Sequence, residues 1–405
     1  MPLLLPSNAP CLKATDMQPH WQLPFFDSTH SELAASVQQW VLSQQVDESD
    51  DRAACREWVQ RLGQAGWLRH CVPRAHGGVR ENLDSRALVI LRETLAWYSP
   101  LADFSFAMQG LGSGAITLAG TPEQQAHYLP RVAQGTCIAA FALSEPQAGS
   151  DVAGMRTSAS KVADGFVLNG MKTWISNGGM ADFYVVFAKT DPDAGARGIS
   201  AFIVDTPSAG LDDSEHLHVM SPHPLASLRF DDCRVATSQC LGEVNAGFKL
   251  AMRTLDIFRA SVAGAAIGMG RRALHEAISY SRQRRMFGGH LADFQLTQAR
   301  LGEMSSLLES AALLTYRAAW LRDTHGSDGD AAIAYTRAAA MAKSVATENA
   351  SRVIDMALQM HGGTGVLVGH TLESLYRDIR ALRIYEGATE VQQLIIGKSL
   401  LKSAA

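Results

Sequence analysis

The chain has 405 residues, of which 47% are hydrophobic and 19% charged, values that are ordinary for a globular protein. Its formal net charge is -4 and no basic block stands out, which excludes the electrostatic footprint of a nucleic-acid-binding protein. A chain of this length has room for two or three domains.

Neither a metal centre nor a membrane segment is expected. The six cysteines are scattered singly, without a CxxC pair or zinc-ligand spacing to histidine, as is typical of reduced thiols. No stretch approaches the roughly 20 apolar residues of a membrane helix. Residues 1–30 contain no arginine, unlike a mitochondrial transit peptide. We therefore expect a cytoplasmic protein.

The first part of the chain is predicted to be helical after a short arm. Residues 1–27 contain five prolines and little periodicity, which indicates an extended N-terminal arm. From Ser28 onward, Leu33, Val37 and Val41 share one face at helical spacing. Further helical patterns cover 58–62, 85–97 and 122–132, and the Pro and Gly residues of 72–78 predict a loop. An N-terminal helical domain is expected over 28–136.

The pattern then changes to strands and back to helices. Short segments rich in β-branched and aromatic residues predict a β-barrel or sandwich domain over 137–246; they are 138–143, 165–168, 182–188, 199–204, Val219, 228–230 and Val235. Long amphipathic segments predict a C-terminal helical bundle over 247–405; they are 248–282, 291–325, 330–360, 373–379 and 390–401. The expected fold is therefore mixed α and β, mainly α.

Three patterns are better explained by structure than by chemistry. Gly110–Gly114 resembles part of a dinucleotide-binding loop but lacks the preceding strand and the acidic residue about 20 positions later. Small residues for close helix packing are the better interpretation. Gly268 and Gly270 lie inside a predicted helix, and His216 and His218 have no third ligand to complete a metal site.

Two segments in the first half suggest ligand contacts. The stretch 143–154 (LSEPQAGSDVAG) contains a turn with exposed backbone N–H groups, which suits an anionic or carbonyl-rich ligand. The stretch 170–177 (GMKTWISN) places a tryptophan between hydroxyl side chains, where it can stack on a flat ring. Taken alone, an ordinary loop and a half-buried strand remain alternatives.

Two segments in the second half also suggest ligand contacts. The stretch 280–288 (YSRQRRMFG), followed by Gln295, clusters arginines that can clamp a diphosphate, although a solvated helix end explains it equally well. The stretch 359–365 (QMHGGTG) has glycines that allow close approach of a ligand. Glu386 follows apolar and aromatic residues in 384–392, and partial desolvation would raise its pKa and make it a general base.

In this order, the four segments resemble the acyl-CoA dehydrogenase family, and the resemblance extends from about residue 31 to 402. It implies an N-terminal helical domain, a middle β-domain and a C-terminal four-helix bundle. It also implies FAD bound between the β-domain and the bundle, completed by a neighbouring subunit of a homotetramer built as a dimer of dimers.

The resemblance assigns roles to individual residues. Those expected to contact FAD are Phe141, Leu143, Ser144, Gly149, Ser150, Trp174, Ser176, Arg284, Phe287, Gln295, Gln359, Gly362, Gly363, Ala388 and Glu390. Those expected to contact the acyl-CoA substrate are Ser150, Asp256, Arg259, Tyr385 and Gly387. Arg284, Phe287 and Gln295 are expected to reach across a dimer.

The implied reaction is α,β-desaturation of an acyl-CoA thioester, in the catabolism of fatty or other carboxylic acids. Glu386 removes the α-proton while hydride leaves for flavin N5, and an electron-transfer flavoprotein reoxidises the flavin. Some family members carry the base one residue before the arginine that Arg259 matches, and here that residue is Phe258.

Two departures from the family pattern stand out. Ala388 replaces a common threonine, and the loop 221–227 (SPHPLAS) replaces a Met-Gly-x-Arg-x-Ser stretch. Rival hypotheses are a flavin oxidase or monooxygenase on the same fold, and a non-catalytic acyl-CoA-binding protein. The sequence leaves the acyl group open, although Gly110–Gly114 suggests a bulky or compact one.

Overall fold

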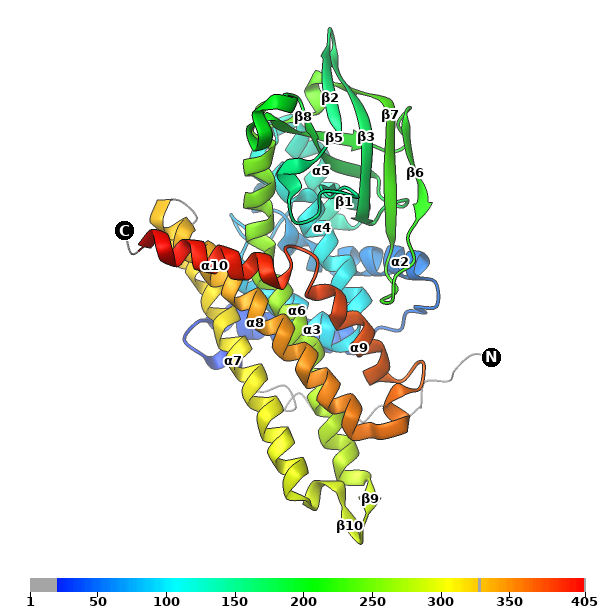
Figure 1. Ribbon diagram of the computed structural model, residues 1–405, viewed down its shortest axis with the longest axis vertical. Helices are drawn as coiled ribbons and strands as arrows, with labels where there is room; N and C mark the ends of the chain where they lie inside the picture. Colours follow the sequence, from blue (N-terminus) through cyan, green and yellow to red (C-terminus); the bar gives the residue numbers. More distant parts are fainter. Residues whose placement is uncertain (1–19, 327–328, 404–405) are drawn as a thin grey trace.

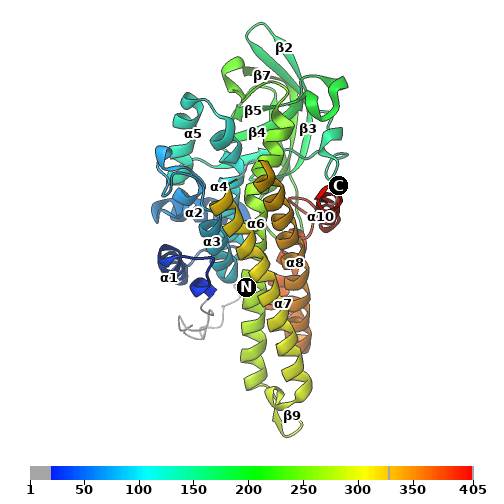
Figure 2. The ribbon, with the colours of Figure 1, turned by 90° about the vertical axis from the view of Figure 1, so that its left-hand side faces the viewer.

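The computed structural model describes residues 20–326 and 329–403 (Figure 1). Helices, then a sheet domain, then helices follow one another along the chain, as the sequence predicts. Most of the expected N-terminal arm lies outside the described residues, and His20–Gln22 forms a short 3-10 helix. In Figures 1 and 2 the sheet lies at one end of an elongated molecule and the long C-terminal helices extend to the other.

Five α-helices make up the first part of the described chain. They are α1 (Ser28–Leu42), α2 (Asp51–Gln64), α3 (Ser85–Tyr98), α4 (Pro100–Ala119) and α5 (Pro122–Gln134). Polar side chains cap their N-termini by accepting backbone hydrogen bonds, as N-caps do; the capping residues are Asp27, Asp50, Asp84, Ser99 and Thr121. The predicted loop at 72–78 contains the 3-10 turn Arg74–His76.

Helix α4 was not among the predicted helices. It is buried on nearly all sides, so it lacks the polar face that makes a helix visible in a sequence. A methyl group on Gly110 or Gly114 would lie 2.7 or 3.0 Å from the ring of Phe258, and one on Gly112 would lie 2.7 Å from Ala139. The packing interpretation of these glycines is therefore confirmed. The ring of Phe258 occupies the space beside Gly110 and Gly114.

The middle of the chain forms a single eight-stranded sheet. Its strands are β1 (Ala139–Ala142), β2 (Ser158–Val162), β3 (Gly165–Ser176), β4 (Phe183–Lys189), β5 (Ile199–Asp205), β6 (Leu211–His216), β7 (Leu225–Ala236) and β8 (Cys240–Leu241). The order is β6-β7-β3-β2-β4-β5-β8, and β1 pairs in parallel with β4. His216 ends the largely exposed strand β6. Among the described residues no group of side chains could hold a metal ion.

Long helices form the C-terminal part. They are α6 (Gly247–Gln283), α7 (Gln295–His325), α8 (Gly329–His361), α9 (Thr371–Leu382) and α10 (Thr389–Ser403), with a hairpin of β9 (Arg285–Met286) and β10 (Gly289–His290) between α6 and α7. Figures 1 and 2 show α6, α7 and α8 side by side. No helix in the described part of the chain is long and apolar enough to cross a membrane.

Helices α3 and α6 approach so closely that only glycine fits at the crossing. A methyl group on Gly268 would lie 2.1 Å from the carbonyl oxygen of Glu93, and one on Gly264 would lie 2.9 Å from that of Val89. This contact joins the N-terminal helices to the bundle.

We therefore expect Gly268→Ala to lower the free energy of unfolding by about 1–3 kcal/mol, because the two backbones must separate. Gly302 of α7 is the matched control: no atom lies within 4 Å of its added methyl group. Gly302→Ala should stabilise the protein by up to about 1 kcal/mol, since alanine favours helix. Urea denaturation measures both, and equal effects at the two positions would contradict the close-contact explanation.

Candidate active site

The turn between α9 and α10 presents a carboxylate that makes no hydrogen bond. Glu386 has a φ angle of 52° and Gly387 one of 90°. Both carboxylate oxygens of Glu386 are buried and have no hydrogen-bond partner among the described residues. Lys343 Nζ donates to the Gly387 carbonyl at 2.7 Å, and Gln392 Nε2 donates to the same oxygen at 2.9 Å. The turn is thus fixed while its carboxylate stays free.

Charged side chains from four helices surround this carboxylate. Burial raises the pKa of Glu386, and the nearby charges of Arg92 (α3), Lys343 (α8) and Arg259 (α6) oppose that rise, whereas Asp103 (α4) adds to it. Burial also lowers the pKa of Lys343 to about 8. A buried carboxylate whose pKa is raised in this way is suited to accept a proton, as a general base must.

Arg92 is held in place by a buried ion pair. Its Nε and one terminal nitrogen donate to the two oxygens of Asp103 at 2.8 and 2.9 Å, and its other terminal nitrogen donates to Ser261 Oγ at 3.1 Å. Both partners of the pair are almost fully buried. The guanidinium therefore joins α3, α4 and α6 next to the turn that carries Tyr385 and Glu386.

Asp256 and Arg259, which were expected along the substrate channel, form an ion pair on α6. Arg259 is only 5% exposed, and Asp256 also accepts from Thr336 Oγ1 of α8 at 3.0 Å. Phe258 between them is buried against α4 and offers no base. The structure places this pair at the α6–α8 contact, within electrostatic reach of Glu386.

The loop after β1 is anchored by a second buried ion pair. Lys172 Nζ of β3 donates to Glu145 Oε1 at 2.8 Å and to the Leu143 carbonyl at 3.2 Å. Glu145 also accepts the backbone N–H groups of Arg156 and Thr157 at 2.6 and 3.0 Å. No hydrogen bond among the described residues uses the N–H groups of 149–151, so the anchored loop presents free donors.

Trp174 lies directly beside this loop. The β3–β7 register shifts between Lys172 and Ile175, and Trp174 has a φ angle of 60°, which marks a bulge. The bulge leaves the indole 58% exposed, while Thr173 N donates to the Ser144 carbonyl at 3.0 Å. The structure therefore brings together one group of expected flavin contacts; its members are Phe141, Leu143, Ser144, Gly149, Ser150, Trp174 and Ser176.

A second group lies at the far end of the bundle. Arg284 precedes the β9–β10 hairpin, at whose tip Phe287 is 87% exposed, and Gln295 begins α7. Gln359, Gly362 and Gly363 lie at the end of α8, where His361 stacks on Tyr280 of α6 at 4.1 Å. The hairpin and the sheet are at opposite ends of Figure 1, so one chain does not bring the two groups together.

The beginning of α10 carries the last expected contacts. Ala388 is half-buried beside the turn, and Glu390 is exposed. The hydroxyl of the following Thr389 donates to Glu348 Oε1 of α8 at 2.7 Å. Thr389 therefore does not replace the hydroxyl that the family pattern has at position 388.

The donor set fits FAD. An exposed indole offers a flat face for a ring system, and exposed Arg284 offers a guanidinium for a diphosphate. An added methyl group on Gly149, Gly362 or Gly363 would meet no atom within 4 Å, so these backbones are open to close approach.

Sequence reasoning missed the cations around Glu386. Arg92 and Lys343 are buried within helices whose neighbouring residues are also buried. A charged residue inside an apolar helix stretch was the available signal, because such residues are rarely buried without a partner.

Comparison with known proteins agrees with this geometry. Models of the acyl-CoA dehydrogenase N-terminal, middle and C-terminal domains match residues 27–136, 140–233 and 245–401. A 3-(aryl)acrylate reductase of Clostridium sporogenes is 37% identical over 385 residues, which are 93% of this chain and 100% of that protein. The caffeyl-CoA reductase-Etf complex subunit CarC of Acetobacterium woodii is 38% identical over 361 residues, 88% of this chain and 92% of that protein.

A solved structure is also similar over nearly the whole chain. Butyryl-CoA dehydrogenase from Megasphaera elsdenii superposes with a TM-score of 0.86 at 32% identity, covering 93% of this chain and 99% of that one. The chain therefore belongs to the acyl-CoA dehydrogenase family and has FAD as its cofactor.

Proposed function

We propose that this protein is an acyl-CoA dehydrogenase that converts an acyl-CoA thioester to a trans-2-enoyl-CoA, with Glu386 as the base. The observation that carries the proposal is the buried, unbonded carboxylate of Glu386 among three cations. A carboxylate kept only for stability would be expected to make hydrogen bonds, because burying an unpaired charge is costly.

The chain's own residues perform the proton chemistry. No hydrogen bond among the described residues uses the N–H of Glu386, so it is available to hold the thioester carbonyl. This N–H stabilises enolate charge while the Glu386 carboxylate removes the α-proton. Bound FAD supplies the acceptor for the β-hydride. Arg92, Lys343 and Arg259 favour the ionised form of this carboxylate.

Two copies of the chain supply each FAD site in this proposal. The group around Trp174 contacts the ring system, and Ala388 and Glu390 lie near the turn of the same chain. Arg284, Phe287, Gln295, Gln359, Gly362 and Gly363 come from a second copy, because one chain holds them far from Trp174. A homotetramer, a dimer of dimers, satisfies this requirement with closed symmetry.

Electron transfer to an electron-transfer flavoprotein completes the cycle. The name of the Acetobacterium relative includes such a partner, which supports this choice over oxygen. The Clostridium and Acetobacterium relatives are both named reductases, so a second candidate is the reverse reaction on an aryl acrylyl thioester. Oxygen consumption during turnover would instead favour an oxidase.

The decisive variant is Glu386→Gln, which keeps size and the backbone N–H but removes the base. Flavin reduction by a good acyl-CoA, followed anaerobically by absorbance, should slow by more than the 10²–10⁴-fold that is about the usual worth of general-base catalysis. FAD binding and the spectral perturbation by substrate should persist. Near-normal bleaching would place the base elsewhere.

The pH dependence tests the charges around the base. Because Glu386 must be ionised, kcat/KM should fall as pH falls through its raised pKa. Asp103→Asn removes a nearby negative charge and should move this acidic limb to lower pH. Arg92→Gln removes the cation that contributes most to stabilising the ionised form and should move the limb to higher pH. Shifts in the same direction would contradict electrostatic control.

The cross-subunit FAD site predicts an effect of Arg284→Ala. The side chain is exposed within one chain, so its loss should leave folding unchanged. Loss of a charge-assisted contact costs about 1.5–3 kcal/mol, so the FAD dissociation constant should rise tenfold or more. Light scattering gives the oligomeric state, and a monomer that binds FAD with wild-type affinity would rule out a shared site.

A further inference from the structure

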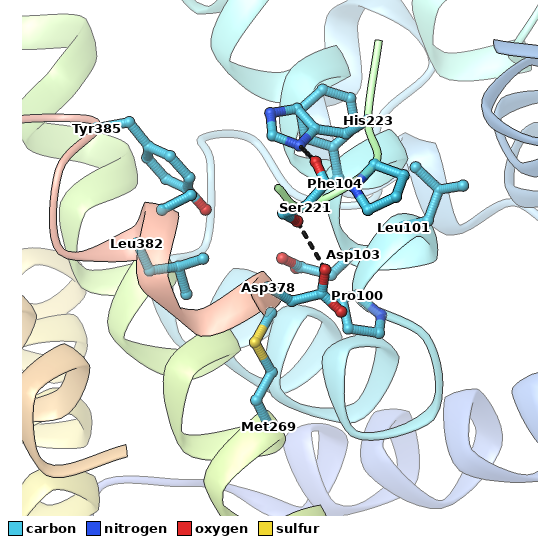
Figure 3. A pocket seen from close by; sticks show the side chains of 12 residues that line it. Pro100, Leu101, Asp103, Phe104, Ser221, His223, Met269, Asp378, Leu382 and Tyr385 are labelled. Atoms are coloured by element: carbon cyan, nitrogen blue, oxygen red, sulfur yellow. Dashed lines mark hydrogen bonds between the residues drawn. The ribbon is translucent and has the colours of Figure 1, made fainter. Parts of the chain in front are cut away.

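A small cavity lies next to the turn that carries Glu386. It measures about 30 Å³, enough for one water molecule or one hydroxyl group. Figure 3 shows Tyr385 and Leu382 on one side and Asp103, Asp378 and His223 on the other. The N-terminal helices, the loop between β6 and β7, and the bundle all contribute to its wall. We call it the acceptor cavity; its polar lining residues are Asp103, Ser221, His223, Asp378 and Tyr385.

The His223 ring presents a lone pair. Its Nδ1 lies 2.8 Å from the Ser221 carbonyl oxygen, which can only accept, so Nδ1 carries the proton. Burial lowers the pKa of His223, which keeps the ring neutral and leaves Nε2 as an acceptor. Phe104 packs against the ring with centroids 4.7 Å apart. In Figure 3 the second ring nitrogen points away from Ser221, toward the side of Tyr385.

Asp378 adds a carboxylate without a cationic partner. Ser221 Oγ donates to Asp378 Oδ1 at 2.6 Å, and no described residue donates to Oδ2. The neighbouring Arg377 is engaged elsewhere, by Glu373 at 2.6 Å and by the Met220 carbonyl at 2.9 Å. Burial raises the pKa of Asp378 to about 6, so it is ionised at neutral pH.

The remaining acid of the cavity is already neutralised, because both oxygens of Asp103 are held by Arg92. The apolar part of the lining includes Leu101, Phe104, Met269 and Leu382. The acceptor cavity therefore offers two acceptors that have no donor among the described residues, Asp378 Oδ2 and His223 Nε2, in a wall that is partly apolar and partly polar.

The position of the acceptor cavity connects it to the substrate. Tyr385 lines it and directly precedes Glu386 in the chain. Arg92 forms an ion pair with Asp103, which lines the cavity, and its charge also favours the ionised form of Glu386. Tyr385 thus connects the acceptor cavity to the turn that carries Glu386.

On the basis of the proposed function, we propose that the acceptor cavity selects acyl-CoA substrates whose acyl group carries a hydroxyl group beyond the α,β bond. The hydroxyl donates to Asp378 or His223 and satisfies an acceptor that the protein leaves open. Sites built to bond a substrate hydroxyl reject the analogue that lacks it, often strongly.

The test uses the FAD-loaded enzyme and matched substrate pairs. These are 3-phenylpropanoyl-CoA against its 3- and 4-hydroxyphenyl analogues, and hexanoyl-CoA against 6-hydroxyhexanoyl-CoA. For at least one pair, kcat/KM should favour the hydroxylated member tenfold or more. The ratio should approach one in Asp378→Asn and in His223→Phe. Asp355→Asn, an exposed carboxylate on α8, is the control that should keep the wild-type ratio.

Calorimetry provides a readout that is independent of turnover. The enoyl-CoA products of each pair should show the same preference in their dissociation constants, and both variants should lose it. If the ratio of the hydroxylated to the unsubstituted member is close to one for every pair in the wild type, the acceptor cavity is refuted as a hydroxyl site. A preference that both variants retain would refute it as well. Absence of flavin reduction by every acyl-CoA would instead refute the proposed dehydrogenation, and the calorimetric comparison would still report on the cavity.

Discussion

The structure is organised around one buried carboxylate that has no hydrogen bond. Taking a carboxylate out of water is costly unless nearby charges compensate for the lost hydration. For Glu386 the compensation comes from Arg92, Lys343 and Arg259, on three different helices. Each cation also bonds to another group, so none forms a hydrogen-bonded ion pair with Glu386. The helices must keep their relative positions for this balance to hold. The glycines where α3 crosses α6 allow the two helices to pack this closely.

The sheet domain also contains buried charged side chains, but these form a direct ion pair. Lys172 and Glu145 are also buried, but they pair directly at 2.8 Å. That pair fixes the loop after β1 against β3, next to the bulge that turns Trp174 outward. The fully satisfied pair gives rigidity, whereas the unsatisfied Glu386 gives reactivity. Both kinds of buried charge lie where chain segments distant in sequence converge.

The sequence predicted the order of the domains and most long elements, because the hydrophobic period of α1 or α6 depends on local residues alone. It failed for α4, which is buried all round, and for β6, which is mostly exposed; neither has one apolar face. Glu386 was found from its motif, but Arg92 and Asp103 were not. Their role depends on three helices that meet at one turn, and the spacing of residues in the sequence does not predict that contact.

The departure at 221–227 shows how specificity can change without altering the base. In place of the family's Met-Gly-x-Arg-x-Ser stretch, this chain has Ser221, Pro222 and His223 beside the carboxylate of Asp378. When Ser227 is matched to the serine of that stretch, Leu225 takes the place of the arginine. The neutral histidine leaves an acceptor at the cavity, while Glu386 keeps its own cations. Because the two carboxylates have separate partners, the lining of the acceptor cavity can vary while the charges around Glu386 are retained.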